Sequence, residues 1–244
     1  MNLKQDLIPY IKGDKFSEGL YIPLAQSQKN ISDRINYIVE YCRGKKVIHV
    51  GCLDHEPLIL KKIEANTWLH KRIEDVAAKQ VGIDINKAGV AFVKGNTPFS
   101  NVYFEDVSSL EPAGEFIQAE FWDAMILGEV LEHVNDPISF LKKMKEKYSP
   151  FVKEVLISVP NAFAWENFRL AISHKECINS EHRAWFSVYT LAKNLGEAGY
   201  RDFSYDFVSY EPGGIKNRHF IKFLLKKFPA LRSTIIMKAQ FGQI

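Results

Sequence analysis

Short apolar runs alternate with segments of helical periodicity along most of the chain after residue 30. Apolar runs typical of strands occur at 45–51, 80–85, 101–107, 121–128, 154–160 and 203–211. Between them, apolar residues recur every three or four positions, which indicates helices that bury one face. The run at 121–128 is almost continuously apolar, as in a strand that is buried on both faces. Strands separated by helices predict an α/β fold with a parallel, doubly wound sheet and right-handed crossovers.

The sequence predicts where three of these helices begin or end. The first begins near residue 30, where Ile31, Ile35, Ile38 and Val39 recur at helical spacing, and Ser32 or Asn30 is suited to cap it. The second is expected to cover the whole of 129–148 as one amphipathic helix. The third, at 188–200, is expected to end at Gly199 because glycine adopts the left-handed conformation of a helix terminus.

The composition is that of an ordinary globular chain. It has 244 residues, of which 46% are hydrophobic and 13% aromatic, enough to bury a sizeable core. No apolar stretch approaches the roughly 20 residues of a membrane span, and the start lacks the apolar block of a secretory signal. Three cysteines are too few for a disulfide framework or a zinc cluster. These features favour a reducing, cytoplasmic location.

The formal net charge of +3 conceals an asymmetry. Seven basic and no acidic residues follow Pro212, which leaves residues 1–211 with a net charge of −4. A basic, partly apolar end of this kind suits nucleic acid, a membrane surface or neither. The acidic balance of the remainder disfavours an RNA substrate, because phosphate contacts require clustered basic residues.

The residues that follow the predicted strands are the candidates for ligand binding, since parallel sheets bind ligands beyond their carboxyl ends. Gly51 and Cys52 follow the first strand and allow a close approach of the backbone. Asp84 follows the second and can accept the hydroxyls of a ribose, with Ile85 against an adenine face. Asp106 follows the third and can accept an exocyclic amine.

Each of these residues also has a purely structural alternative. Asp84 could cap the next helix, and Asp106 could close a turn, as aspartates at strand ends often do. Cys52 could be a small packing residue.

Four or five motifs, in the expected order, resemble the class I S-adenosylmethionine-dependent methyltransferases. The most specific is 121–137, which contains Gly-Glu-Val-Leu-Glu-His-Val and is similar to the family's fourth motif in its small-molecule and glycan branches. Segments 157–161 (Ile-Ser-Val-Pro-Asn) and 182–187 (His-Arg-Ala-Trp-Phe-Ser) match later parts of the family pattern. The resemblance covers roughly residues 31–240.

The first motif departs from the family pattern. His49 stands where the family usually has an acidic residue, and Leu53 and His55 stand at or near positions usually held by glycine. Asp54 or His55 is therefore a candidate replacement for the usual contacts to the methionine end of the cofactor.

The resemblance implies a seven-stranded, mostly parallel sheet with an antiparallel last strand. We expect that strand at 233–239, inserted beside the fifth strand and preceded by a helix at 219–228 that carries part of the basic charge. Residues 31–244 then form one domain, with an aromatic insertion near 161–185 over the acceptor pocket. Residues 1–30 are suited to close that pocket as a lid.

The implied cofactor is S-adenosylmethionine. The residues expected to bind it are Gly51, Cys52, Asp84, Ile85, Asp106, Val107, Gly128 and Glu129.

The Glu-x-x-Glu-His string leaves three interpretations open. On one helix, Glu129, Glu132 and His133 would share a face and could bind a divalent cation, with His182 as a fourth ligand. Quinone O-methyltransferases and small-RNA 2′-O-methyltransferases use a string of this kind with a further histidine. Alternatively, His133 faces the substrate as the catalytic base, because its unperturbed pKa is near neutral. The remaining interpretation is that these residues have only structural roles.

The sequence therefore predicts a methyltransferase that O-methylates a small molecule, such as a sugar or a surface-glycan precursor. An aromatic, quinone-type or amine acceptor is an alternative, and so is a catalytically inactive scaffold that binds the cofactor. A nicotinamide oxidoreductase is disfavoured because residues 53–55 do not supply its glycine-rich turn. The predicted partner is a small-molecule acceptor, with neither nucleic acid nor a membrane span.

Overall fold

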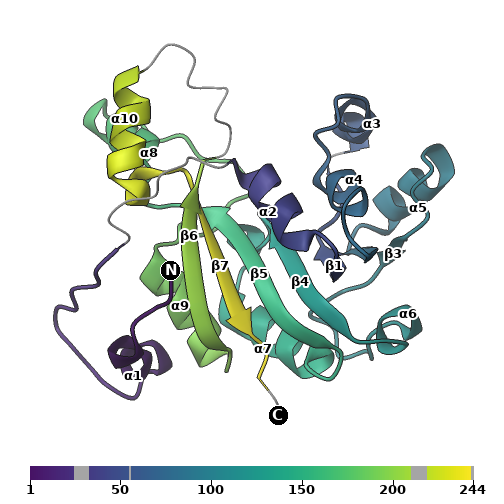
Figure 1. Cartoon of the computed structure of the whole chain (residues 1–244), viewed down its shortest axis with the longest axis horizontal. Helices are drawn as coiled ribbons and strands as arrows, with labels where there is room; N and C mark the ends of the chain where they lie inside the picture. Colours follow the sequence, from purple (N-terminus) through teal and green to yellow (C-terminus); the bar gives the residue numbers. More distant parts are fainter. Residues whose placement is uncertain (25–32, 55, 210–218, 243–244) are drawn as a thin grey trace.

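The computed structural model describes residues 1–24, 33–54, 56–209 and 219–242 (Figure 1). In these residues a seven-stranded sheet has the order β3-β2-β1-β4-β5-β7-β6. The strands are β1 (Lys46–Val50), β2 (Lys79–Asp84), β3 (Val102–Phe104), β4 (Trp122–Gly128), β5 (Val152–Pro160), β6 (Arg201–Val208) and β7 (Thr234–Gln240). Neighbouring strands from β3 to β5 are parallel, whereas β7 is antiparallel to both β5 and β6. The predicted fold class and antiparallel last strand are confirmed.

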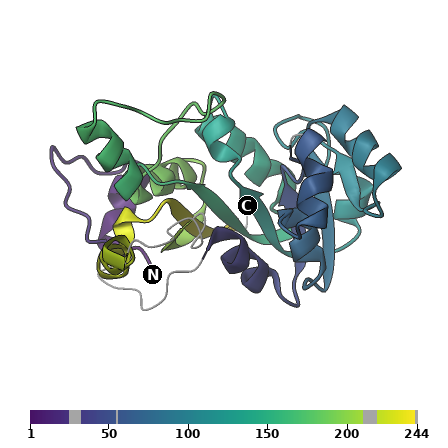
Figure 2. The same ribbon diagram turned by 90° about the horizontal axis from the view of Figure 1, so that it is seen from above.

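Helices cover both faces of the sheet. The helices are α1 (Ile8–Lys12), α2 (Arg34–Cys42), α3 (Glu56–Glu64), α4 (Leu69–Glu74), α5 (Lys87–Asn96), α6 (Glu115–Gln118), α7 (Pro137–Tyr148), α8 (Trp165–Ile172), α9 (Val188–Glu197) and α10 (His219–Lys227). Figure 2 shows α2, in dark purple, on one side of the sheet and α7, in teal, on the other.

The continuous apolar run of β4 follows from this two-sided burial. Ala124 and Ile126 pack in the cluster that contains α2 and α4. Met125 and Leu127 pack in the opposite cluster, which contains α7 and α9. Successive side chains of a strand point to opposite faces, so a central strand between two helical layers needs apolar residues at every position.

The expected helix over 129–148 is wrong over 129–136. Residues Leu131–His133 form a short 3₁₀ turn, and α7 begins only at Pro137. Asp136 caps α7 by accepting a hydrogen bond from the Ser139 N–H at 3.0 Å. Proline is favoured in the first turn of a helix, where its missing N–H costs no hydrogen bond, and it is disfavoured in the helix interior. The start of α2 also differs from the prediction, because Asp33 caps it and Asn30 and Ser32 lie outside the described residues.

The N-terminal residues pack against β6 and α9. The Leu3 N–H donates to the Phe203 carbonyl at 3.0 Å, and the Tyr205 N–H donates to the Met1 carbonyl at 2.8 Å. Ile11 is fully buried against Gly196, where a Cβ atom would lie 2.4 Å from its Cγ2. Within the described ranges, no helix combines the length and the apolar character required to cross a bilayer.

Candidate functional site

The carboxyl ends of β1, β2 and β4 meet at one edge of the sheet. Val50 is in register with Ile83 on one side and with Leu127 on the other. The next residues of these strands and their exits, Gly51, Asp84 and Gly128, are therefore neighbours. This is the edge at which open parallel sheets bind ligands.

Gly51 has a conformation and a packing environment that require glycine. Its φ is +63°, and a Cβ atom there would lie 2.6 Å from Val130 Cγ2. Its N–H donates to the Ile83 carbonyl at 2.9 Å, which ties the turn after β1 to the end of β2. The exit from β1 thus presents bare backbone at the edge.

Asp84 lies between the exits of β1 and β2. Its Oδ2 accepts a hydrogen bond from the Leu53 N–H at 3.1 Å, and its Oδ1 accepts one from the Asn86 N–H at 2.9 Å. Asn86, and not Asp84, caps α5, because its side chain accepts from the Gly89 N–H. The two donors hold the carboxylate in one orientation and leave lone pairs on both oxygens. Ile85, next to it, has 68% of its surface exposed.

The loop after β3 is closed by its own aspartate. Asp106 Oδ1 accepts hydrogen bonds from the Ser108 N–H and from the Ser108 hydroxyl, both at 2.8 Å. The turn-closing alternative thus accounts for one oxygen of this carboxylate. Val107 is buried in the core, so its side chain packs against the protein.

Cys52 is a packing residue. Its side chain is buried with Ile59 and Trp68, and burial raises the pKa of its thiol well above the usual value. Its carbonyl accepts a hydrogen bond from the Trp68 indole N–H at 3.0 Å. Cys52 also packs closely against Gly82, because a Cβ atom at Gly82 would lie only 2.7 Å from the Cys52 Sγ.

Glu129 leaves β4 with a φ of +60°. Its N–H donates to the Ser158 carbonyl at 3.1 Å, and the Ser158 hydroxyl donates to its Oε1 at 3.1 Å. Arg34 Nε lies 4.0 Å from the same carboxylate oxygen. These contacts fix an unusual backbone conformation at the carboxyl end of β4.

Arg34 is a site residue that the sequence-based prediction missed. It is the first residue of α2, it is 8% exposed, and its Nη1 lies 3.4 Å from the position that a Cβ of Gly128 would occupy. The guanidinium therefore lies at the carboxyl end of β4. The signal for it was an arginine four residues before Ile38, on the apolar face of the predicted helix.

Three of the four predicted metal ligands lie together. Glu132, His133 and His182 each offer a ligand atom, and these atoms are all within 4.8 Å of one another. The Glu132 side chain is fully buried, and neither of its oxygens has a hydrogen-bond partner among the described residues. The His133 and His182 rings are perpendicular, with centroids 4.7 Å apart. Glu129 is outside this group and bonds to Ser158 instead.

The chain holds this cluster together from two distant segments. The Arg183 N–H donates to the Glu132 carbonyl at 2.8 Å, and the Arg183 Nε donates to the His133 carbonyl at 2.9 Å. His182 is thereby fixed beside the 3₁₀ turn that carries the other two residues, so the cluster does not need the helix expected at 129–133.

Burial perturbs the ionisation of the cluster. It raises the pKa of Glu132, and the nearby Glu129 carboxylate raises it further. It also lowers the pKa of His182, with a smaller effect from His133. A buried carboxylate that accepts no hydrogen bond in the described part of the chain, with one imidazole nitrogen 3.9 Å away and a second imidazole beside it, has ligand types that could hold a divalent cation. A cation bound there would favour the ionised form of Glu132.

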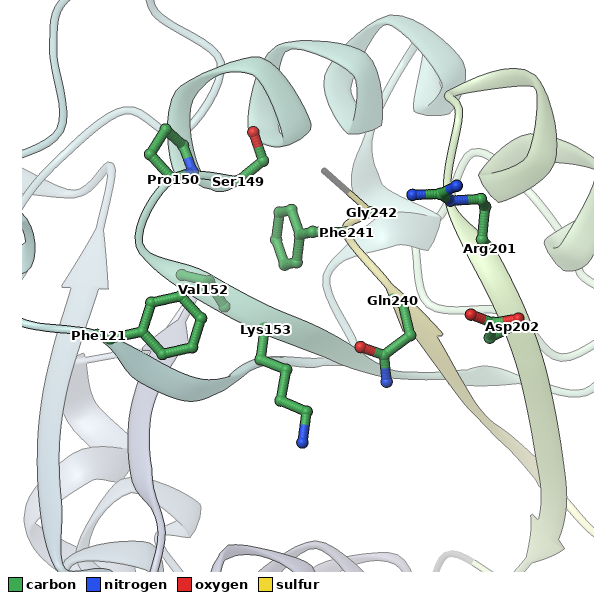
Figure 3. A pocket seen from close by; sticks show the side chains of 10 residues that line it. All are labelled: Phe121, Ser149, Pro150, Val152, Lys153, Arg201, Asp202, Gln240, Phe241 and Gly242. Carbon is green, nitrogen blue, oxygen red and sulfur yellow. The ribbon is translucent and has the colours of Figure 1, made fainter. Parts of the chain in front are cut away.

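A cavity of about 850 Å³ lies elsewhere, at the opposite edge of the sheet (Figure 3). It is lined by residues near the amino ends of β4, β5 and β6, including Phe121, Lys153 and Arg201. None of the predicted site residues lines it, so it is separate from the candidate site.

Known proteins place this arrangement in context. Residues 24–205 match the family model described as methyltransferase domain. No curated protein matches the chain. A possible histamine N-methyltransferase from Thermotoga maritima has a similar structure, with 10% identity, a TM-score of 0.54, and coverage of 85% of this chain and 87% of that one.

Two further structures share the fold. Magnesium protoporphyrin IX methyltransferase from Synechocystis, solved with bound S-adenosylhomocysteine, has 12% identity and a TM-score of 0.51, over 84% of this chain and 81% of that one. The small RNA methyltransferase HEN1 has 16% identity and a TM-score of 0.52, over 92% of this chain and 28% of that one. At these identities the similarity concerns the fold.

Proposed function

The chain belongs to the methyltransferase domain family and is an S-adenosylmethionine-dependent enzyme, and we propose that it methylates a hydroxyl group with the help of a divalent cation. The observation that carries the proposal is the buried Glu132 carboxylate, which accepts no hydrogen bond from the described residues and lies 3.9 Å from His182 Nε2, next to His133. A hydroxyl has a high pKa, so its methylation needs a group that either removes the proton or lowers the pKa of the hydroxyl. Amine and thiol acceptors need less help of this kind.

The edge of the sheet offers groups that match each part of the cofactor. The Asp84 carboxylate, held by two N–H donors, suits the ribose hydroxyls, and the exposed Ile85 suits the face of the adenine. We propose that the adenine amine donates a hydrogen bond to Oδ2 of Asp106, because Ser108 donates to Oδ1. Gly51 and Gly128 provide backbone without side chains beside these groups.

At the methionine end, we propose Arg34 and Glu129 in place of the family's usual first-motif contacts. A guanidinium suits the carboxylate of the methionine part, and a carboxylate suits its ammonium group. Asp54, one predicted substitute, forms an ion pair with Lys62. His55, the other, lies outside the described residues.

Methyl transfer from the sulfonium is an in-line displacement, so the protein chiefly aligns the acceptor and excludes water. When bound by Glu132, His133 and His182, a divalent cation would lower the pKa of a hydroxyl that coordinates it. In its absence, His133, which is half-buried, is the base that accepts the hydroxyl proton. In either case His133 is the catalytic residue that we assign.

We propose a sugar or surface-glycan precursor as the acceptor, bound under the segment 161–185. This segment exposes Phe163 and Phe168, and aromatic faces pack against sugars and aromatic rings alike. Quinone-type acceptors therefore remain the alternative substrate class. Residues 13–24 are the described part of the chain that we assign as a lid, because residues 1–12 are fixed against β6 and α9.

The cysteines support a reducing, cytoplasmic location as part of the proposal. Cys42, Cys52 and Cys177 are all free thiols.

Calorimetry with S-adenosylhomocysteine, followed by turnover on a panel of sugars, phenols and amines, tests the proposal. We expect binding and cation-dependent methylation of a hydroxyl acceptor. Absence of binding at millimolar concentration would reject the cofactor site. Binding without turnover on any acceptor would favour the inactive scaffold, and methylation unaffected by a chelator would reject the cation.

A further inference from the structure

Exposed apolar side chains gather at the β6 end of the sheet. Seven large ones in the described residues have between 46% and 96% of their surface exposed: Phe16, Tyr21, Phe163, Phe168, Ile172, Phe223 and Phe228. Both views place α8, α10 and the segment 13–24 at this end of the molecule (Figure 1, Figure 2). We call these seven residues, together with the exposed lysines of α10, the β6-end face. Exposed apolar residues gathered in this way indicate an interaction site.

The helix α10 gives this face a positive charge. Leu225 is buried against the rest of the protein, whereas Lys222, Phe223, Lys226 and Lys227 are exposed. No acidic residue occurs anywhere in 212–244. A short helix whose solvent side combines lysine with phenylalanine is suited to a bilayer surface, where rings enter the acyl boundary and ammonium groups bind phosphates.

The distribution of charge and apolar side chains favours lipid over other partners. The exposed rings come from three segments that are far apart in the sequence, which suits a flat, fluid surface. An RNA backbone would need cations across the whole face. On α8, however, Arg169 forms an ion pair with Glu166, so the positive charge is concentrated on α10.

We propose that the β6-end face binds an anionic lipid surface. The proposal also bears on the acceptor, and in this respect it rests on the proposed function. α8 belongs to the segment whose far end, at Arg183, is hydrogen-bonded to the Glu132 and His133 carbonyls. The docking face is thus continuous along the chain with the site, which favours a membrane-anchored compound as the hydroxyl acceptor.

Co-sedimentation of the full chain with vesicles tests the docking directly. We expect binding to vesicles of phosphatidylcholine and phosphatidylglycerol, weaker binding to phosphatidylcholine alone, and weakening by salt. Each lysine of α10 changed to glutamine should reduce the binding constant about fivefold. The double variant F223S/F228S should reduce it by about tenfold or more.

Two exposed residues away from this face provide matched controls. Phe121→Ser removes a ring that is 56% exposed at the amino end of β4, and Lys142→Gln removes an exposed charge on α7. Both controls should bind vesicles as the wild type does. Equal losses in the controls, or no binding to anionic vesicles, would overturn the proposal.

Two further outcomes would also overturn it. If the wild type is a dimer in gel filtration and F223S/F228S is a monomer, a second copy covers the face. If the α10 lysines are needed to bind a labelled single-stranded RNA but not vesicles, the partner is nucleic acid. Calorimetry with S-adenosylhomocysteine on the same variants should show unchanged affinity, which separates a failure of docking from a failure of the cofactor site.

Discussion

The ammonium group of Lys147 lies 3.0 Å from the carbonyl oxygen of Asp106. It also lies 3.2 Å from Ser109 Oγ and 3.4 Å from Glu105 Oε1, and both charged side chains are almost fully buried. Tyr148 donates a further hydrogen bond to Glu105. The end of α7 therefore fixes the loop after β3, which carries the aspartate that we propose for the adenine amine.

Lys147→Met should weaken cofactor binding without touching the cofactor. The variant leaves the Glu105 carboxylate buried without its ammonium partner, which destabilises the fold by about 3–5 kcal/mol. We expect about tenfold weaker binding of S-adenosylhomocysteine in calorimetry, a loss of about 1.4 kcal/mol. Tyr148→Phe, which removes only one hydrogen bond, should give a smaller effect in the same direction.

Lys142→Met is the control for that prediction, because Lys142 is exposed on the same helix. It should change neither stability nor affinity. Lys147→Arg should restore part of the affinity. A folded Lys147→Met protein that binds S-adenosylhomocysteine as the wild type does would show that this contact does not position the loop.

Asp84→Ala should abolish measurable binding of S-adenosylhomocysteine. The variant removes the carboxylate and leaves the Leu53 and Asn86 N–H groups without their acceptor. Two lost charge-assisted hydrogen bonds to the ribose would weaken binding by about 3 kcal/mol or more, roughly two orders of magnitude. Asp75→Ala, at an exposed position after α4, should bind normally. Retained affinity in Asp84→Ala would reject the ribose assignment.

Gly51→Ala should destabilise the fold by about 1–3 kcal/mol, because of its positive φ and the contact of the new Cβ with Val130. Val130→Ala should relieve part of that loss in the double variant. Gly95→Ala, in α5 with open space around it, should stabilise by about 0.5–1 kcal/mol instead. Urea unfolding measures all four proteins, and equal effects at positions 51 and 95 would contradict this account of Gly51.

The fold could be predicted from the sequence because strands that are buried on both faces of a sheet are almost continuously apolar. The apolar run of β4 and the glycine after α9, whose φ is +87°, produced correct elements. Residues 129–136 differ from the prediction because their helical spacing coincides with a 3₁₀ turn, whereas the helix is started only by the Asp136 cap and Pro137. Period alone cannot distinguish a turn from a helix over five residues.

The site was predictable only in part. The spacing of Glu132 and His133 was visible, but their approach to His182 depends on two hydrogen bonds from Arg183 to backbone carbonyls. Such contacts leave no pattern in the sequence. The role of Arg34 depends on its position at the start of α2 beside Gly128 and Glu129, which is also a tertiary feature.

Two buried histidines should make stability depend on pH. His49 and His70 stack with centroids 5.5 Å apart, and burial lowers the pKa of both, that of His70 to about 4. In the unfolded chain an imidazole binds a proton at about pH 6.5. As the pH falls below that value, the unfolded state gains protons that the folded state does not, so the free energy of unfolding decreases.

From His70 alone, the loss between about pH 7 and about pH 5 should be about 2 kcal/mol. Urea unfolding at the two pH values measures it. His70→Leu should show a smaller loss over the same interval, whatever its stability at neutral pH. An unchanged loss in that variant would mean that His70 does not titrate on unfolding in this range.

Binding of Mn²⁺ to the purified protein, measured by calorimetry, tests the cation site most directly. The account predicts one bound ion per chain in the wild type and in Glu146→Gln, an exposed change on α7. It predicts at least a hundredfold weaker binding in Glu132→Gln and in His182→Ala, each with normal affinity for S-adenosylhomocysteine. No Mn²⁺ binding by the wild type, or equal binding by Glu132→Gln, would contradict the account.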